Sequence, residues 1–303
     1  MLPIRLAGCL ALAAGLLPAQ TLYAPKRPGG VYSAPHRPHT RLADLVKKHA
    51  GQAVWHEVIV DDDHLRSHYI QLKPGTRTPR ALHPDTRAWW VVMDGEVRFD
   101  IETHTPFVAA KGSMVQVPMA TLYSLEVLGT KPALIFETNI AGARTLYAAR
   151  EDAPKLPGFD FIAVNYSRRP GVWGRANRPH VTFAEMADAL ESGRVTGTQR
   201  IVEDDRGAAN FIYGYEKNLP PIDPKQKGHY HPECAEYWLI MKGQIRYPVE
   251  GQGIIIANEG DVVYVPKFTW HAPRWYGPGA SCRLAMNGYP YIAHLFEGEA
   301  AQK

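Results

Sequence analysis

Residues 229–243 read HYHPECAEYWLIMKG and combine a strand, a turn and a group of polar side chains. The run Trp238–Met241 is short, branched and aromatic, which predicts a buried strand. Lys242-Gly243 then supplies the two residues of a tight hairpin turn. His229 and His231 lie two positions apart, so on a strand their side chains face the same side, roughly 7 Å from each other. The stretch therefore predicts a β-hairpin that carries a polar site.

The same pattern occurs earlier in the chain. Met93-Asp94-Gly95-Glu96 matches Met241-Lys242-Gly243-Gln244, and Gly112 through Pro118 matches Gly260 through Pro266, both 148 positions later. A collinear order with a constant offset indicates that a whole domain is duplicated. The extra residues of the second copy fall in the Pro-rich stretch Leu219–Lys227, where a loop insertion costs little.

Both copies show the same order of predicted elements. An Arg-Pro-His tripeptide ends at His39 and at His180, and a short helical pattern follows each one. Short apolar runs separated by Gly, Pro and Asp come next and predict many β-strands. Such a sequence favours a closed or two-sheet antiparallel barrel over a βαβ fold. We therefore predict an all-β chain of two tandem barrels, each preceded by a short α-helix.

The N-terminus has the features of a secretory signal peptide. Arg5 precedes the apolar stretch Leu6–Leu17, and Ala19 ends a small-residue cleavage site. The stretch is short for a bilayer span, and no later stretch could cross a membrane. We therefore expect a secreted or periplasmic protein with no stable membrane insertion after cleavage. The predicted division is a signal peptide at 1–19, an N-terminal barrel at 20–150, a linker at 151–167 and a C-terminal barrel at 168–303.

Charge and cysteine content exclude two further classes of protein. The chain has 34 Lys and Arg against 30 Asp and Glu, and a net charge of +4 is too small for a dedicated nucleic-acid binder. Without residues 1–19, only Cys234 and Cys282 remain, so a disulfide framework cannot stabilise the fold. The sequence leaves open whether these two cysteines pair and whether the protein forms homo-oligomers.

Four side chains of the second copy form a candidate metal site: His229, His231, Glu236 and His271. Glu236 lies five residues beyond His231, and in an unbroken strand this odd step would turn it away. Pro232 resists regular strand geometry, so a bend there can restore the facing of Glu236. Three imidazoles and one carboxylate suit one divalent transition-metal ion, with Mn, Fe, Cu, Zn and Ni all remaining candidates.

These residues and their spacing resemble the two cupin motifs. The segment from His229 to Gly243 has the pattern His-x-His, then four residues, a Glu, six residues and a Gly. The segment from Gly260 to His271 has a Gly, then five residues, a Pro and, five positions later, a His. The resemblance implies a bicupin similar to oxalate decarboxylase and quercetin dioxygenase-type proteins, with two double-stranded β-helix (jelly-roll) barrels. Two positions depart from the motif, because Phe268 replaces its usual second Gly and Trp275 its terminal Asn.

The first copy provides an internal comparison. Ala81, His83, Ala88 and Tyr123 occupy the positions of the four ligands there. Alanine offers no lone pair, and the two remaining side chains cannot form a tight site. We therefore expect a degenerate, metal-free N-terminal barrel.

Four aromatic side chains are candidates for the wall of a substrate pocket. Strand periodicity from Glu236 directs Trp238 inward, and Trp275 is expected to face the opening of the barrel. Tyr213 and Tyr215 lie on the strand before the insertion and could add further walls. Core packing is the competing role for each of them.

An exported, metal-dependent oxidoreductase, dioxygenase-like or oxalate-processing, is the leading hypothesis. Its partner would be a small oxygenated organic molecule. Two alternatives stay open: a redox-silent isomerase or lyase of sugar-like compounds, and a non-catalytic module that binds a small molecule or saccharide through the ion. Neither nucleotide-binding loops nor hydrolase nucleophile elbows are visible in the sequence.

Overall fold

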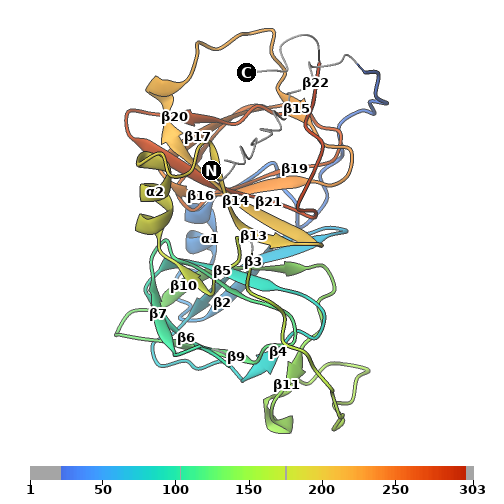
Figure 1. Cartoon of the computed structure of the whole chain (residues 1–303), viewed down its shortest axis with the longest axis vertical. Helices are drawn as coiled ribbons and strands as arrows, with labels where there is room; N and C mark the ends of the chain where they lie inside the picture. Colours follow the sequence, from blue (N-terminus) through green and yellow to red (C-terminus); the bar gives the residue numbers. More distant parts are fainter. Residues whose placement is uncertain (1–21, 103, 175, 298–303) are drawn as a thin grey trace, which may run out of the picture.

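The computed structural model describes residues 22–102, 104–174 and 176–297, and the predicted signal peptide lies outside this part of the chain. Two β barrels are stacked along the long axis of the molecule, with the N-terminal barrel below the C-terminal one in Figure 1. The predicted all-β class is confirmed, since the α-helices are confined to two short segments within the described residues. None of the described helices is long and apolar enough to span a membrane.

The N-terminal barrel has two antiparallel sheets. The six-stranded sheet has the order β12-β8-β5-β10-β3-β2, and the five-stranded sheet has the order β11-β4-β9-β6-β7. The elements from the start of the described chain to the linker are β1 (His39–Thr40), α1 (Leu42–Lys48), β2 (Trp55–Asp61), β3 (Leu65–Leu72), β4 (Ala81–Leu82), β5 (Ala88–Asp94), β6 (Glu96–Ile101), β7 (Phe107–Ala110), β8 (Met114–Val117), β9 (Tyr123–Val127), β10 (Ala133–Ile140), β11 (Leu146–Tyr147) and the 3-10 helix η1 (Arg150–Asp152).

The C-terminal barrel repeats this arrangement. Its large sheet has the order β1-β19-β16-β21-β14-β13, and smaller sheets β18-β17-β20 and β15-β22 face it. The elements are β12 (His180–Val181), α2 (Phe183–Glu191), β13 (Thr198–Asp204), β14 (Gly207–Tyr215), the 3-10 helix η2 (Glu216–Asn218), β15 (His229–Tyr230), β16 (Glu236–Lys242), β17 (Gln244–Val249), β18 (Gly253–Asn258), β19 (Val262–Val265), β20 (Arg274–Tyr276), β21 (Ala280–Asn287) and β22 (Leu295–Phe296).

The predicted hairpins occupy equivalent places in the two barrels. Gly95 joins β5 to β6 and Gly243 joins β16 to β17, and both have positive φ, at 80° and 66°. The duplication also explains the backbone at Phe268, which has φ 63°. Ala120, its counterpart in the first copy, has φ 56°. The left-handed turn that glycine would favour is therefore retained in both copies without glycine.

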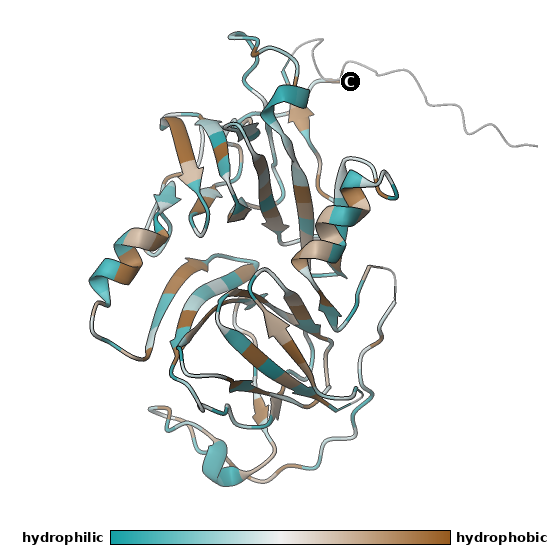
Figure 2. Ribbon diagram, turned by 90° about the vertical axis from the view of Figure 1, so that its left-hand side faces the viewer, coloured by the Kyte–Doolittle hydropathy of each residue, from teal (hydrophilic) through white to brown (hydrophobic). Residues whose placement is uncertain are grey.

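Each barrel receives one short strand from the other half of the chain. β1 pairs with β19 at His39↔Val263, and β12 pairs with β8 at His180↔Val115. The helices that follow these strands lie on opposite sides of the junction between the barrels (Figure 2). Strand pairing therefore crosses the predicted domain limits in both directions. These limits divide the sequence and remain a prediction.

The junction between the barrels is a hydrophobic core shared by both. Tyr69 and Trp89 from the N-terminal half and Phe211 and Tyr237 from the C-terminal half belong to this one cluster, and each is at most 1% exposed. Strand alternation produces it: one face of each large sheet turns to the other barrel, while the opposite face lines its own barrel interior. The interiors form two separate apolar clusters.

Candidate metal centre

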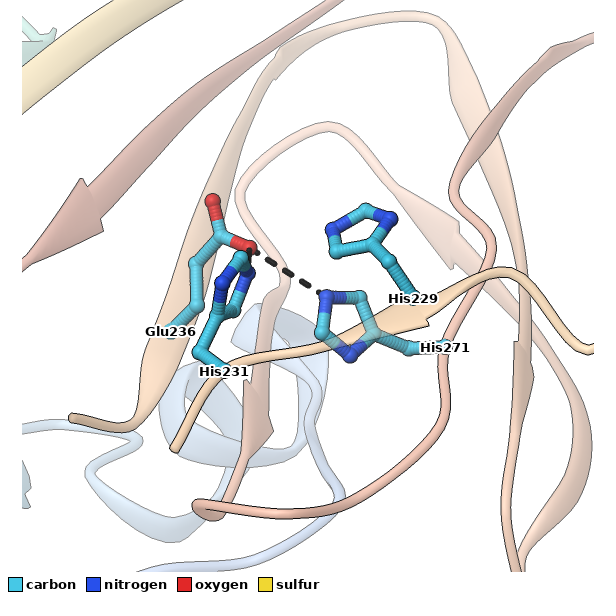
Figure 3. A group of neighbouring side chains, drawn as sticks. All are labelled: His229, His231, Glu236 and His271. Atoms are coloured by element: carbon cyan, nitrogen blue, oxygen red, sulfur yellow. Dashed lines mark hydrogen bonds and ion pairs between the residues drawn. The ribbon is translucent and has the colours of Figure 1, made fainter. Parts of the chain in front are cut away.

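The structure brings the four predicted ligands together in the C-terminal barrel. His229 lies in β15, His231 follows that strand, Glu236 begins β16, and His271 precedes β20. One ligand atom from each side chain lies within 4.8 Å of the others, and Figure 3 shows all four pointing toward a common centre. The segment 231–235 between β15 and β16 is not strand, so the odd spacing from His231 to Glu236 does not turn Glu236 away.

Backbone hydrogen bonds hold two of these ligands side by side. The His229 N–H donates to the His271 carbonyl at 3.0 Å, and the His271 N–H donates to the His229 carbonyl at 3.0 Å. Gly228 makes this close approach feasible: its φ is 84°, and a Cβ at this position would lie 1.9 Å from the His271 carbonyl oxygen. The sequence analysis missed Gly228, although a glycine directly before a ligand motif is a usable signal of close backbone approach.

We expect Gly228→Ala to weaken metal binding by at least about tenfold, because the new methyl group must displace His271. The left-handed backbone adds about 1–2 kcal/mol of destabilisation. Gly251→Ala is the matched control: Gly251 has φ 75°, and its Cβ would meet nothing within 4 Å. Metal titration and thermal unfolding of both variants test this, and equal metal affinities would contradict the role given to Gly228.

The outer nitrogens of two imidazoles are fixed by backbone carbonyls. His231 Nδ1–H donates to the Ala293 carbonyl at 2.7 Å, and His271 Nδ1–H donates to the Thr269 carbonyl at 2.9 Å. Because Nδ1 is occupied in this way, Nε2 of each ring faces the centre of the site, where it is available to a metal ion. The nearest atom there is Glu236 Oε2, at 2.9 Å from His231 Nε2 and 3.3 Å from His271 Nε2.

The electrostatics of the site fit a bound cation. His231, Glu236 and His271 are only 2%, 6% and 1% exposed. Burial would raise the pKa of Glu236, but the hydrogen bonds from His231 and His271 hold it well below its usual range. Burial lowers the pKa of His229 to about 2, with the charge of His271 adding to the effect, so His229 stays neutral. Glu236 is therefore ionised next to the neutral His229, and a divalent transition metal that replaces the contacts of Glu236 with the two Nε2 atoms would find three imidazole nitrogens and one carboxylate oxygen.

His229 supplies a further observation in favour of a metal. Its Nε2 atom is buried and has no hydrogen-bond partner among the described residues. A buried polar nitrogen without a partner is costly, and a metal ion in the centre of the site would satisfy it. The site therefore fits one ion held by three imidazole nitrogens and one carboxylate oxygen.

A C-terminal segment covers the ligands. β22 pairs with β15 at His229↔Phe296, and the Phe296 ring lies 5.3 Å from the His229 ring. The His294 ring lies 4.7 Å from that of His229 and 4.6 Å from that of His231. The sequence analysis did not place His294 here, because it lies just before β22, outside both ligand motifs.

Three of the four predicted pocket residues need correction, and two of them are the tyrosines. Tyr213 alternates with Ile212 on β14, so it faces the core between the barrels rather than the metal ligands. The hydroxyls of Tyr213 and Tyr215 both donate to Glu191 Oε1 on α2, at 2.5 and 2.9 Å. These two tyrosines attach the helix to the sheet and do not line the site.

The two predicted tryptophans both lie in the barrel interior. Trp238 is 1% exposed, and its ring lies 5.2 Å from that of His271, so it forms one wall of the metal centre. Trp275 packs against the same interior cluster, but its ring covers Gly214. Gly214 pairs with Ser281, at the end of β21 away from Glu236. The expectation that Trp275 faces the opening is therefore wrong.

In the N-terminal barrel, the equivalent positions form a hydrogen bond instead of a metal site. His83 Nδ1–H donates to the Arg144 carbonyl at 2.9 Å, which leaves Nε2 to accept from the Tyr123 hydroxyl at 3.0 Å. Ala81 and Ala88 contribute no donor atoms. Within the described residues, the only cluster with metal-binding geometry is the C-terminal one.

Cys234 and Cys282 are both free and buried, which settles the pairing that the sequence left open. Burial raises the pKa of Cys234 to about 12 and that of Cys282 well above its usual value. We expect neither thiol to react with an aromatic disulfide reagent at pH 8 in the folded protein, and both to react after unfolding. Rapid reaction of the native chain 20–303 would contradict this.

Comparison with known proteins agrees with the geometry. The Cupin domain family matches residues 68–139 and again residues 216–286. The chain carries two cupin domains. This bicupin superimposes on a single-site variant of Bacillus subtilis oxalate decarboxylase with a TM-score of 0.52 and 15% identity, over 88% of this chain and 81% of that one.

Two further solved structures show the same fold. For a Lactobacillus farciminis oxalate decarboxylase formate complex, the TM-score is 0.54 at 11% identity, over 88% of the bicupin and 90% of that chain. For a cupin 2 conserved barrel domain protein from Leptotrichia buccalis, it is 0.52 at 11% identity, over 82% and 95%. No curated protein matches the sequence. At these identities the similarity establishes the fold of the bicupin, and the chemistry must be argued from its own residues.

Proposed function

We propose that this bicupin is a metal-dependent oxidoreductase, dioxygenase-like or oxalate-processing, that acts on a small oxygenated organic molecule in its C-terminal barrel. The observation that carries the proposal is the convergence of His229, His231, Glu236 and His271 on one centre. The fold shared with two oxalate decarboxylases supports a metal-dependent enzyme. The substrate does not follow from that similarity.

The residues of the site have separable roles. Three imidazoles and Glu236 would hold one divalent ion, and such an ion supplies Lewis-acid or redox chemistry to an oxygen-containing ligand. The carbonyls of Ala293 and Thr269 hold His231 and His271 in the tautomer that directs Nε2 inward. Trp238 keeps water from one side of the centre, and the segment from His294 to Phe296 covers another.

Elemental analysis and oxygen uptake test the proposal together. We expect one equivalent of a transition metal per chain, and either oxygen consumption with at least one member of a panel of carboxylates, phenols and sugars, or release of formate and carbon dioxide in equal amounts from oxalate. Turnover of that panel under argon would instead support a redox-silent isomerase or lyase. Ligand-induced thermal stabilisation without any product would support a binding module.

We also propose that the protein is exported and that residues 1–19 are removed. The apolar stretch Leu6–Leu17 and the small residues before Gln20 support this. The intact mass of material recovered from the periplasm or medium should then correspond to a chain that begins at Gln20. Recovery of only the full-length chain from the cytoplasm would overturn export.

A further inference from the structure

Glu137 is an ionisable side chain in the interior of the N-terminal barrel. Ala133 and Ile135 belong to the apolar cluster inside this barrel, so Glu137, two residues further along β10, faces the same way. Its side chain nevertheless stays 25% exposed. Solvent therefore reaches this interior carboxylate, which makes it available to a ligand.

Two donors hold the Glu137 carboxylate in its ionised form. His68 Nε2–H donates to Oε1 at 3.1 Å, and Trp90 Nε1–H donates to Oε2 at 2.5 Å. Partial burial would raise the pKa of Glu137, but these hydrogen bonds and the charges of His68 and His83 hold it below its usual value. Among the described residues, His68 is its only ion-pair partner, and histidine supplies no permanent positive charge. The barrel interior therefore keeps a negative charge that is not paired with a lysine or arginine in this part of the chain.

The second copy shows that the fold does not require a carboxylate at this position. Ala285 on β21 is the counterpart of Glu137. It pairs with Trp238, just as Glu137 pairs with Trp90, and it packs in the apolar interior of the C-terminal barrel. The barrel with the metal ligands thus lacks this carboxylate, and the barrel with the carboxylate lacks the metal ligands. A charge that the fold does not require costs stability in an interior, and it points to a ligand.

Tyr147 lies at the opening of the N-terminal barrel, near Glu137. It pairs with Ala81, while Phe296 pairs with His229, the metal ligand that corresponds to Ala81. Since Phe296 covers the metal ligands, Tyr147 covers the equivalent place in the N-terminal barrel. Burial raises the pKa of Tyr147, and the charge of Glu137 adds to this rise. The two side chains therefore lie within electrostatic range of each other.

A cavity of about 300 Å³ adjoins Tyr147, and segments 145–150 and 161–164 form most of its wall. The lining side chains are mainly apolar, and the ring of Phe161 lies 5.9 Å from that of Tyr147. Arg150 is the one charged side chain in the lining, and it is exposed. β11 marks this end of the molecule in Figure 1, away from the metal centre. Tyr147 therefore connects an apolar cavity, of a size that suits a small molecule, to an interior carboxylate.

The chemistry of these two parts selects an amphipathic cation. An ammonium group forms charge-assisted hydrogen bonds with a carboxylate, and aromatic ring faces attract it. An apolar cavity favours an alkyl or aryl group. We propose that the N-terminal barrel binds a hydrophobic primary amine, with the ammonium group at Glu137 and the apolar part beside Tyr147 in the cavity. This inference goes beyond the proposed function and does not depend on the metal centre.

Calorimetric titration of the full chain with phenethylamine tests the inference, with phenethyl alcohol as the neutral analogue. We expect the alcohol to bind at least about tenfold more weakly than the amine. Glu137→Gln should weaken amine binding at least about tenfold, because the charge is lost while the amide oxygen can still accept from Trp90. Glu126→Gln is the matched control and should keep the affinity of the unmodified chain. Glu126 alternates on β9 with Leu125 and Val127 of the interior cluster, so it faces outward.

Two further variants separate this site from the metal centre. Tyr147→Ala removes the aromatic wall at the barrel opening and should weaken amine binding about threefold or more, with metal content unchanged. His231→Ala is expected to lose the metal and should still bind the amine as tightly as the unmodified chain. Loss of amine binding in His231→Ala would place the amine on the metal and overturn the inference.

Thermal unfolding distinguishes ligand binding from a purely structural role of Glu137. The amine should raise the melting temperature of the unmodified chain and of Glu126→Gln, but not that of Glu137→Gln. If Glu137 served only as a partner of His68 and Trp90, Glu137→Gln would lower the melting temperature without ligand and leave amine affinity unchanged, and this result would refute the site. Absence of phenethylamine binding at millimolar concentration, or equally tight binding of phenethyl alcohol, would refute it as well.

Discussion

His231→Ala is expected to reduce the bound metal from one ion per chain to none that survives gel filtration. The substitution removes one of three imidazoles, and the carboxylate of Glu236 loses the closer of its two imidazole contacts, at 2.9 Å. Loss of one of four ligands, together with the loss of its contact to Glu236, is expected to weaken the site enough to release the ion at trace free metal. Elemental analysis after gel filtration in metal-free buffer measures the loss.

His83→Ala is the matched control for this prediction. His83 is the counterpart of His231 in the first copy, is also buried, and also donates from Nδ1 to a backbone carbonyl. Its replacement breaks the hydrogen bonds to Tyr123 and to the Arg144 carbonyl and should cost about 1–3 kcal/mol of stability. Metal content should stay at one ion per chain. Equal loss of metal in both variants would refute the assignment of the site to one barrel.

The metal ligands could be predicted because their sequence spacing is tied to strand geometry. Two histidines two residues apart share a strand face in any β-structure. Pro232 indicates an interruption of the strand after His231, which allows the Glu236 side chain to face the same side as the histidines. The internal duplication then supplied the comparison with His83 and Tyr123. Each of these inferences needs only local geometry and one long-range repeat.

The pocket walls could not be predicted in the same way, because they depend on which face of a strand is inside. Tyr213 and Ile212 are neighbours on β14, and no motif on that strand shows which of them faces the barrel. The structure turns Ile212 inward and Tyr213 toward the other barrel. On β16 the ligand Glu236 sets which face is inside, and Trp238, two residues later, lies in the interior cluster.

The exchange of strands between the barrels has no local signal either. His39 and His180 were recognisable as a repeated feature, but pairing of their strands with the opposite barrel is a property of the whole fold. The pairing of β1 with the C-terminal barrel explains the roles of two residues there. Asp261 in the C-terminal barrel accepts from the Leu42 N–H at the start of α1, and Gly260 leaves room for the Leu42 side chain.

Separation of the two barrels is expected to unfold both. A chain of residues 168–303 alone would lack β1 and α1 and would expose its half of the core between the barrels, including Phe211 and Tyr237. Burial of each large side chain contributes about 1.5–3 kcal/mol, so the loss of this interface exceeds the roughly 5–15 kcal/mol by which a domain is stable. We expect the isolated C-terminal segment to be insoluble or to lack a cooperative thermal transition.

The matched control keeps both halves and cuts only the connection. A protease site placed in residues 153–165, where the structure has neither helix nor strand, should allow cleavage without separation of the fragments. The cleaved protein should retain its metal and one melting transition, because the buried Tyr237 hydroxyl still contacts Ser67 Oγ at 2.6 Å and Tyr69 still donates to the Gly260 carbonyl at 2.6 Å. A soluble 168–303 fragment that melts cooperatively and binds one metal ion would show instead that the C-terminal barrel is an independent domain, and that the shared core joins two units already stable alone.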